Sequence, residues 1–305
     1  MRLRLAASLV LLGLVAWVVA NAMVGPPHRA GAQTPTIEIQ RAQRAGYLPQ
    51  PSRDRLIVVL AIGSDARPGE RVDRLRADSI HLITVNPRRG AGTILGFPRD
   101  SYVNIPGRGT AKINEAMVVG GPPLLARTVE NITGIRIDYW MLTSFRAFTR
   151  MVHAIGGLRV RIPYPMNDRA SGTHFKRGPK KLSGTQALAF SRDRHSPRNG
   201  DFGRSKNQGT LILAALKKFS QQFQSSSTVL FRWLRAGGFR RVKTDLSLGE
   251  LIDLGLLAAQ MNPRRFRNVV APGSVGKAGS ASIVHLSSSA RRIFRDIRND
   301  GILGG

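Results

Sequence analysis

The chain has 305 residues, 42% of them apolar, and its 47 lysines and arginines against 18 aspartates and glutamates give a formal net charge of +29. That length supports one sizeable core, and the absence of cysteine excludes disulfides, thiolate metal sites and a cysteine nucleophile. The charge predicts attraction to polyanions or anionic surfaces, and nucleic acid is the first such partner to weigh.

The N-terminus carries an uncharged, apolar run over residues 5–24 that is long enough to cross a bilayer as a helix. Arg2 and Arg4 precede this run, and positive charge tends to stay on the cytoplasmic side of a membrane. We therefore expect residues 1–24 to anchor the protein by a single pass in the cytoplasmic membrane, with the folded domain extracytoplasmic. A signal peptide cleaved near Ala20-Asn21-Ala22 is the alternative. Both alternatives argue against nucleic acid as a partner.

Residues 25–54 are rich in Pro, Gly, Gln and charge, which predicts an extracytoplasmic linker, although residues 37–45 could form a short helix. The folded domain is expected over residues 55–305. Its first apolar runs, at 55–63, 79–86 and 92–97, are typical of strands buried on both faces. Residues 135–142 and 158–163 alternate in hydrophobicity, which predicts half-exposed or edge strands.

Helical periods lie between and after these strands. An apolar stripe that starts at Phe145 predicts a helix ending at Gly156-Gly157, and Ser183 with Gln186 forms a capping box for a second helix. Further helices are expected at 203–223, 247–261 and 287–300, with a strand near 266–272. This interleaving predicts an α/β fold, specifically an α/β/α sandwich around a central mixed β-sheet.

The helix predicted at 203–223 begins with charged residues on its buried face. Arg204, Gln208 and Ile212 are spaced i, i+4 and i+8, so the guanidinium and the amide continue the apolar stripe. Asp201 just before them is either a helix cap or a first-turn acid with a specific role. Arg192 and Arg194, two residues apart, would share one face of an extended segment.

Polar loops follow or precede the apolar strands, and ligands in open α/β sheets bind outside strand ends. These loops carry Asp65, Arg76, Asp78, Arg99 and Asp100. Carboxylates beside arginines suit a site in which a hard cation such as Mg²⁺ bridges carboxylate and phosphate oxygens. The pattern therefore indicates phosphoryl-transfer chemistry, whereas GxxxxGK[ST], GxGxxG and GxSxG motifs are absent.

The motifs GSDAR, RAD, FPRDSYVNIPG, KINEA and LSGTQALAFSRDR, followed by D-x-x-R and Gln208, occur in this order. In this the chain resembles the LytR-CpsA-Psr family of cell-wall glycopolymer ligases, most strongly over residues 55–220. The resemblance implies transfer of a glycopolymer from a polyprenyl-pyrophosphate carrier to peptidoglycan, forming a phosphodiester and releasing polyprenyl phosphate.

The resemblance also implies roles for individual residues. It assigns pyrophosphate binding to Arg76, Arg99, Lys112, Arg192, Arg194, Arg204 and Gln208, and the binding of Mg²⁺ (or Mn²⁺) to Asp65, Asp78 and Asp201. Catalysis would involve Arg99, Arg192 and Arg194, with Asp78 or Asp100 as the base that activates the acceptor hydroxyl. One departure from the family pattern is Asn207, which stands where an arginine usually precedes the glutamine. Either Lys206 supplies that charge or the charge is missing.

Two other functions remain open from the sequence. A pyrophosphatase or phosphatase could use the same arginines and metal with water as the nucleophile. A non-catalytic wall-binding protein would need the basic surface but not the aspartates.

Overall fold

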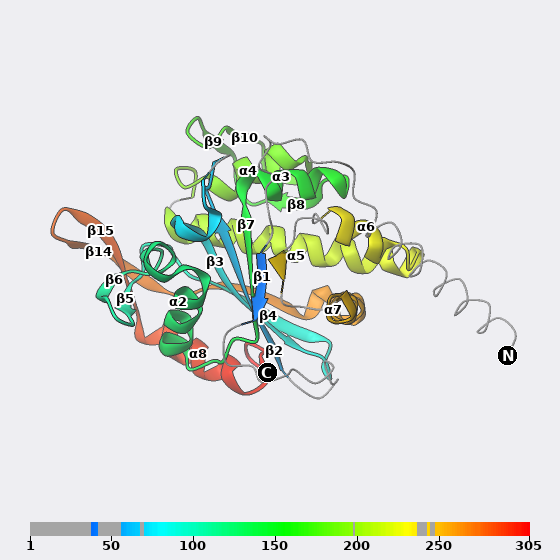
Figure 1. Ribbon diagram of the computed structural model, residues 1–305. Coiled ribbons are helices and arrows are strands. Elements are labelled where there is room, and N and C mark those ends of the chain that lie inside the picture. The colour runs from blue at the N-terminus through cyan, green and yellow to red at the C-terminus, as the bar shows by residue number, and fades with distance from the viewer. Residues whose placement is uncertain (1–37, 42–55, 68–69, 198, 237–242, 245–247) are drawn as a thin grey trace, which may run out of the picture. The chain divides into compact units, whose positions relative to one another are not determined.

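A seven-stranded mixed sheet organises the computed structural model, which describes residues 38–41, 56–67, 70–197, 199–236, 243–244 and 248–305 (Figure 1). The strand order is β12-β1-β7-β2-β3-β4-β13. These strands are β12 (Lys243–Thr244), β1 (Glu38–Arg41), β7 (Tyr139–Ser144), β2 (Ile57–Ser64), β3 (Ala77–Asn86), β4 (Ala91–Gly96) and β13 (Phe266–Val270). Strands β2, β3 and β4 are antiparallel to one another, whereas β7 runs parallel to β2 and β13 parallel to β4.

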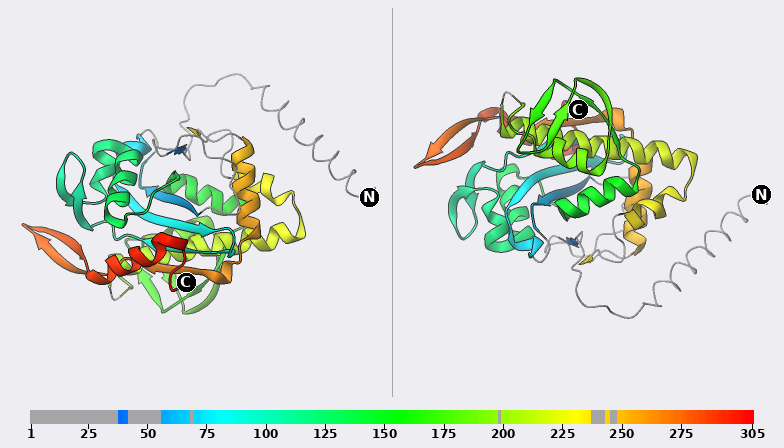
Figure 2. Two further views of the ribbon diagram at one scale, coloured as in Figure 1. Left: turned by 90° about the horizontal axis from the view of Figure 1, so that it is seen from below. Right: turned by 90° about the horizontal axis from the view of Figure 1, so that it is seen from above.

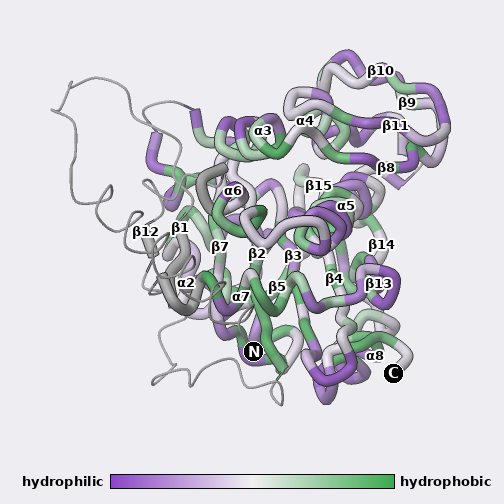
Figure 3. Tube along the Cα trace, turned by 90° about the vertical axis from the view of Figure 1, so that its right-hand side faces the viewer, coloured by the Kyte–Doolittle hydropathy of each residue, from purple (hydrophilic) through white to green (hydrophobic). Residues whose placement is uncertain are grey.

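The central strands are apolar on both faces because helices cover both. On one face, Leu60 and Leu82 pack with residues of α2 (Glu115–Thr133) and α8 (Ser288–Asp300). On the other, Ile57 and Ile94 pack with residues of α3 (Phe145–Ala154), α5 (Asp201–Ser225) and α7 (Leu248–Gln260). Figures 1 and 2 show these helices on opposite sides of the sheet, and Figure 3 shows hydrophobic residues along the central strands.

A second apolar cluster lies beside the main sheet. It joins α3, α5 and α4 (Gly184–Arg192) to two small antiparallel ribbons. One ribbon pairs β8 (Leu158–Ile162) with β11 (Gly178–Leu182), and the other pairs β9 (Met166–Asp168) with β10 (Thr173–Phe175). Helix α6 (Val229–Ala236) follows α5 and packs against its end through Phe219 and Leu230. Two short 3-10 helices span Val72–Arg74 and Pro263–Arg265.

Two hairpins flank the loop that follows β4. Strand β5 (Tyr102–Ile105) pairs with β6 (Gly109–Lys112), and β14 (Gly273–Ala278) pairs with β15 (Ala281–Leu286). The amide of Val284 in β15 donates to the carbonyl oxygen of Asp100 at 2.9 Å, and Ser101 forms a bridge with Val284. The C-terminal hairpin thus holds the loop that carries Arg99 and Asp100.

The α/β fold with a central mixed sheet is confirmed, as are the capping box of Ser183 with Gln186 and the end of α3 before Gly156. Two local expectations are wrong. Residues 38–41 form a strand instead of part of a helix, and β7 is an interior strand because β1 pairs along its outer side. The half-exposed character expected of this strand is nevertheless present, because Met141 is 39% exposed while its neighbour Leu142 is buried.

The proposed anchor, residues 1–24, lies outside the described residues, as does most of the linker. Within the part of the chain that the structure describes, no helix has the length and apolar character that a bilayer crossing requires.

Candidate phosphate-binding site

Three cations, each paired with a carboxylate, gather where β3 begins, where β4 ends and where α5 begins. The pairs are Arg99 with Asp78, Lys112 with Asp100, and Arg204 with Asp201. Residues predicted separately from three loops and a helix are therefore brought together. A cluster of alternating charge holds its arginines in place while leaving N–H donors for an incoming anion.

A tight turn presents Arg99 and Asp100. The amide of Ser101 donates to the carbonyl oxygen of Pro98 at 3.0 Å, and the Ser101 hydroxyl donates to the same oxygen at 2.7 Å. Arg99 and Asp100 are the two central residues of this turn, which immediately follows the buried Phe97. Their side chains are consequently fixed by a short loop between two anchored residues.

Arg99 combines an ion pair with an unpartnered donor. One of its terminal nitrogens donates to Oδ1 of Asp78, while its buried Nε has no hydrogen-bond partner among the described residues. Burial alone would lower the pKa of Arg99, but the carboxylate of Asp78 helps to hold it above its usual value. Arg99 thus remains a cation with a donor available, which is what binding of an oxyanion requires.

The start of α5 contributes Asp201 and Arg204. Asp201 is the first residue of the helix; its Oδ2 accepts from the Arg99 amide at 2.9 Å and its Oδ1 accepts from Arg204. Burial raises the pKa of the Asp201 carboxyl, an effect that the charge of Arg204 only partly offsets. Arg204 itself is 6% exposed. The pair joins the helix start to the turn that carries Arg99.

Gln208 and His81 fix α5 against the sheet. The Gln208 amide nitrogen donates to the carbonyl oxygens of Asp78 and Ser191, both at 3.2 Å. His81 Nε2 donates to the Ser205 carbonyl oxygen at 3.0 Å, and its Nδ1 accepts from the Ser79 hydroxyl at 3.1 Å. A Cβ at Gly96 would clash with Ser205 Oγ, so this glycine permits the close approach of helix and strand. The prediction that Arg204 and Gln208 continue a buried stripe is confirmed.

Arg192, Arg194 and Arg76 are placed differently from the other cations. Arg192 is the last residue of α4 and lies over the Phe145 ring at 5.6 Å, so the expected extended segment is instead a helix end. Arg194 follows in the next loop, and Arg76 directly precedes β3. All three are exposed, and none forms an ion pair with another described residue. They differ in this from Arg99, Lys112 and Arg204, each of which is paired with a carboxylate.

Sequence reasoning missed Asp193, which lies between two of these arginines and is fully buried. Its Oδ1 accepts from the amides of His195 and Ser196 at 3.1 and 3.0 Å, which turns the chain after Arg192. His195 Nδ1 lies 3.0 Å from Oδ1 of Asp168 in β9, tying this loop to the β9–β10 ribbon. The aspartate between two arginines in SRDR was the available signal, because a buried turn residue also fits that pattern.

Asn207 and Lys206 do not replace the missing arginine at the site. The Asn207 amide is buried and donates to the carbonyl oxygen of Phe190 at 3.4 Å. Lys206 donates to the carbonyl oxygen of Asn268 in β13. The proposal that Lys206 supplies the charge is therefore wrong for this structure, because its ammonium points toward the sheet edge.

Of the three predicted metal ligands, Asp65 and Asp78 interact with each other, whereas Asp201 is bonded to Arg99 and Arg204. Asp65 follows a bulge at Gly63/Ser64 that ends the pairing of β2 with β3. Although Asp65 is exposed, partial burial raises the pKa of its carboxyl and the charge of Asp78 raises it further. Both oxygens of Asp201, by contrast, are already engaged. No group of three or more metal-binding side chains occurs among the described residues.

Comparison with known proteins agrees with this arrangement. The LytR_cpsA_psr family model matches residues 28–293. The polyisoprenyl-teichoic acid–peptidoglycan teichoic acid transferase TagU of Bacillus mycoides is 34% identical over 204 residues, which are 67% of this chain and 64% of that protein. This chain therefore spans less than two thirds of the relative's length.

Two solved structures share the fold. TagT, known from Bacillus subtilis, in its complex with LI-WTA has a TM-score of 0.68 at 24% identity, covering 87% of this chain and 97% of that one. YwtF (TagT) with bound octaprenyl pyrophosphate lipid has a TM-score of 0.64 at 23% identity, covering 87% and 95%. Because the family model covers most of the chain, including every residue of the charged cluster, the protein belongs to the LytR_cpsA_psr family.

Proposed function

We propose that this protein transfers a glycopolymer from a polyprenyl-pyrophosphate carrier to peptidoglycan, forming a phosphodiester and releasing polyprenyl phosphate. The observation that carries the proposal is the cluster of Arg99, Arg204 and Lys112, each paired with a carboxylate. Support comes from the name of the Bacillus mycoides relative, a teichoic acid transferase, and from the TagT structures bound to LI-WTA or to octaprenyl pyrophosphate lipid.

In this proposal the arginines bind the diphosphate and stabilise the charge that builds up on it. Arg99 has an unpartnered Nε, and Arg204 is fixed beside it through Asp201. Arg192, Arg194 and Arg76, which are unrestrained by carboxylates, close on the outer oxygens of the substrate. A preorganised donor that acts on developing charge is worth about 10²- to 10³-fold in rate.

Asp65 and Asp78 are the residues that we propose to hold Mg²⁺ or Mn²⁺. Burial and, after it, the charge of Asp78 raise the pKa of Asp65, and a cation between the two carboxylates would relieve their repulsion. Mg²⁺ is commonly bound by one or two protein carboxylates together with substrate phosphates, so the small number of carboxylates fits. When bound, the ion would neutralise charge on the phosphate oxygens. Asp201 instead serves to position Arg99 and Arg204.

The acceptor hydroxyl needs a proton acceptor, and Asp78 and Asp100 remain the candidates. Each is paired with a cation, Asp78 with Arg99 and Asp100 with Lys112 at 3.0 Å. We favour Asp100, because Asp78 is assigned to the metal and because Asp100 lies next to Arg99 in the turn that starts at Pro98, with its side chain 24% exposed. The anchor at residues 1–24 would place this chemistry at the outer face of the cytoplasmic membrane, where carrier and peptidoglycan meet.

The test is a transfer assay with the full chain in detergent. A polyprenyl-pyrophosphate-linked saccharide is incubated with peptidoglycan oligomers and Mg²⁺, using the native protein, Arg99→Ala, and Arg264→Ala as a matched control far from the cluster. Saccharide on the glycan with the native protein and the control, but not with Arg99→Ala, is the expected result. Release of carrier phosphate without transfer would identify a pyrophosphatase, and wall binding that survives Arg99→Ala and Asp78→Ala would identify a binding protein.

A further inference from the structure

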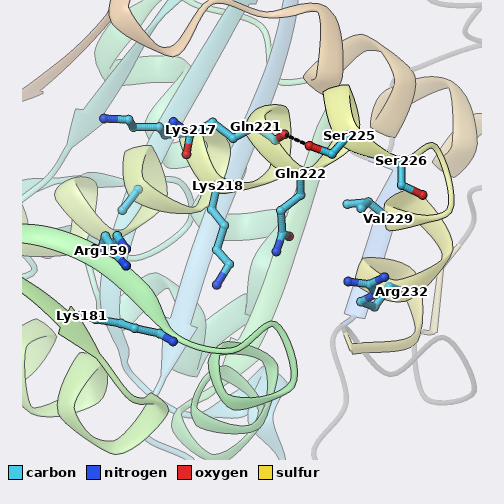
Figure 4. Close-up of a pocket in the computed structure, with 11 residues that line it drawn as sticks. Arg159, Lys181, Lys217, Lys218, Gln221, Gln222, Ser225, Ser226, Val229 and Arg232 are labelled. Atoms are coloured by element: carbon cyan, nitrogen blue, oxygen red, sulfur yellow. Dashed lines mark hydrogen bonds between the residues drawn. The ribbon is translucent and has the colours of Figure 1, made fainter.

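A second cationic region lies in a cavity of about 530 Å³ between the C-terminal half of α5, α6 and the β8–β11 ribbon (Figure 4). Five cations line it: Arg159 of β8, Lys181 of β11, Lys217 and Lys218 of α5, and Arg232 of α6. Figure 4 shows Lys218 and Gln222 extending from α5 into this space. The volume is in the range of ligand-binding cavities.

This cavity lacks the carboxylates that accompany the cations of the first site. None of its lining residues is acidic, so the positive charges repel one another without internal compensation. Burial lowers the pKa of Lys218, and the nearby charges of Lys181 and Arg159 lower it further. Its ammonium donates instead to the Gly157 carbonyl oxygen at 2.7 Å. Like charges held together in this way are relieved by a bound anion.

The cavity lies on the same face of α5 as the first site. The i, i+3 and i+4 steps of the helix place Arg204, Gln208, Leu211, Ala215, Lys218 and Gln222 in one stripe. Its apolar centre is packed with the ribbon and α4, whereas its two polar ends face the two cationic regions. At about 1.5 Å per residue, Lys218 lies about 15 Å along the helix from Gln208.

We propose that this cavity binds the phosphate-bearing chain of the glycopolymer, as a second site about 15 Å or more along α5 from the reacting diphosphate. This inference rests on the proposed function for the identity of the polymer. A chain fits better than a single small anion, because the cations come from four different elements. It fits better than a bilayer surface, because the cations surround a concave space into which the amide of Gln222 also projects.

The experiment measures binding of inorganic polyphosphate to the full chain by fluorescence anisotropy. The variant is Lys181→Ala/Arg232→Ala, two exposed cations of the cavity, and the control is Arg264→Ala/Arg267→Ala, which removes the same charge from exposed positions elsewhere. We expect about a fivefold to tenfold weaker affinity for the cavity variant and less than about a twofold change for the control. The same difference should persist in an Arg99→Ala background, because the two sites are separate.

Three results would overturn the proposal. Equal weakening by the cavity variant and the control would mean that net charge alone binds the polymer. Equally tight binding of polyglutamate would remove the assignment to phosphate, and capture by phosphatidylglycerol vesicles through Lys181 and Arg232 would assign the cavity to a membrane. If the transfer assay fails while polyphosphate binding still depends on Lys181 and Arg232, only the proposed function is wrong. The cavity would then remain a binding site for a phosphate polymer.

Discussion

The two cationic regions of α5 differ in how their charge is balanced. At the N-terminal end, Arg99, Lys112 and Arg204 are each paired with an aspartate, and Arg204 is buried. At the C-terminal end, the five cations of the cavity have no acidic neighbour in its lining. In a chain of net charge +29, a count of cations cannot separate the two regions. The carboxylates do so, because they fix arginines in one geometry for chemistry, whereas uncompensated lysines and arginines attract an anion without orienting it.

The largest expected difference between the two regions is in transfer activity after removal of Arg99 from the first region or of two cations from the cavity. We expect Arg99→Ala to lower kcat by about 10²- to 10³-fold, because its donors act on charge that develops in the reaction. Lys181→Ala/Arg232→Ala should leave kcat within about twofold and raise KM for long polymers. A loss in kcat of similar size for both variants would contradict the division into a reacting site and a polymer-binding site.

The free energy of unfolding should also distinguish the two cationic regions. Asp201→Ala leaves Arg204 buried beside no carboxylate, and removal of one partner of a buried ion pair costs about 3 kcal/mol or more. The double variant Asp201→Ala/Arg204→Met should recover much of this loss, because no unpaired charge remains. Chemical denaturation of both variants provides the free energies of unfolding. Equal destabilisation of the single and double variants would show that the ion pair itself is not responsible.

The dependence of stability on pH tests the contact of α5 with the sheet. Burial lowers the pKa of His81 to about 4, below its ordinary 6.5, so the folded state disfavours the protonated ring. The corresponding stability is complete above pH 6.5 and is lost as the pH falls toward 4, by about 3 kcal/mol. His81→Gln should remove this part of the pH dependence. The check is the difference in unfolding free energy between pH 7 and pH 4.5 for the native chain and the variant.

The smallest effect is expected in the cavity. Lys181→Gln removes a charge that repels Lys218, so it should stabilise the free protein by about 0.5 kcal/mol at low salt. In about 1 M salt the difference should vanish through screening. Thermal melts at two salt concentrations are sufficient. Destabilisation at low salt would mean that the lysines of the cavity do not repel one another.

Much of the fold was predictable because its signals are local. The apolar runs that became β2, β3 and β4, the capping box at Ser183 and the buried stripe from Arg204 to Gln208 are each readable within a few residues. Helix α2 was not predicted, since Gly121, with a φ of 66°, and the following two prolines interrupt its helical pattern. The interior position of β7 depends on pairing with β1, about 100 residues earlier in the chain. Pairings between distant segments leave no periodic signal in either segment.

The site was predictable in its composition but not in its pairing. That Asp78, Arg99 and Asp201 gather at the strand ends followed from the topology of α/β sheets. Which carboxylate meets which cation depends on the turn at Pro98 and on the start of α5, and these are set by tertiary contacts. Asp193 and Lys206 show the same limit of prediction from sequence. The sequence does not reveal that Asp193 is a buried turn residue, or that Lys206 donates to a carbonyl oxygen instead of supplying charge to the site.

The hydrogen bond from Val284 to Asp100 has a consequence for the order in which the protein matures. The turn that carries Arg99 is held by β15, and the Thr84 side chain in β3 donates to the carbonyl oxygen of Gly301. Both contacts involve residues 284–301, which follow every arginine of the site in the sequence. A partly synthesised chain would therefore have every arginine of the site but not the scaffold that aligns them. The alignment of the charged cluster is completed only when residues 284–301 pack against the sheet and the turn that carries Arg99.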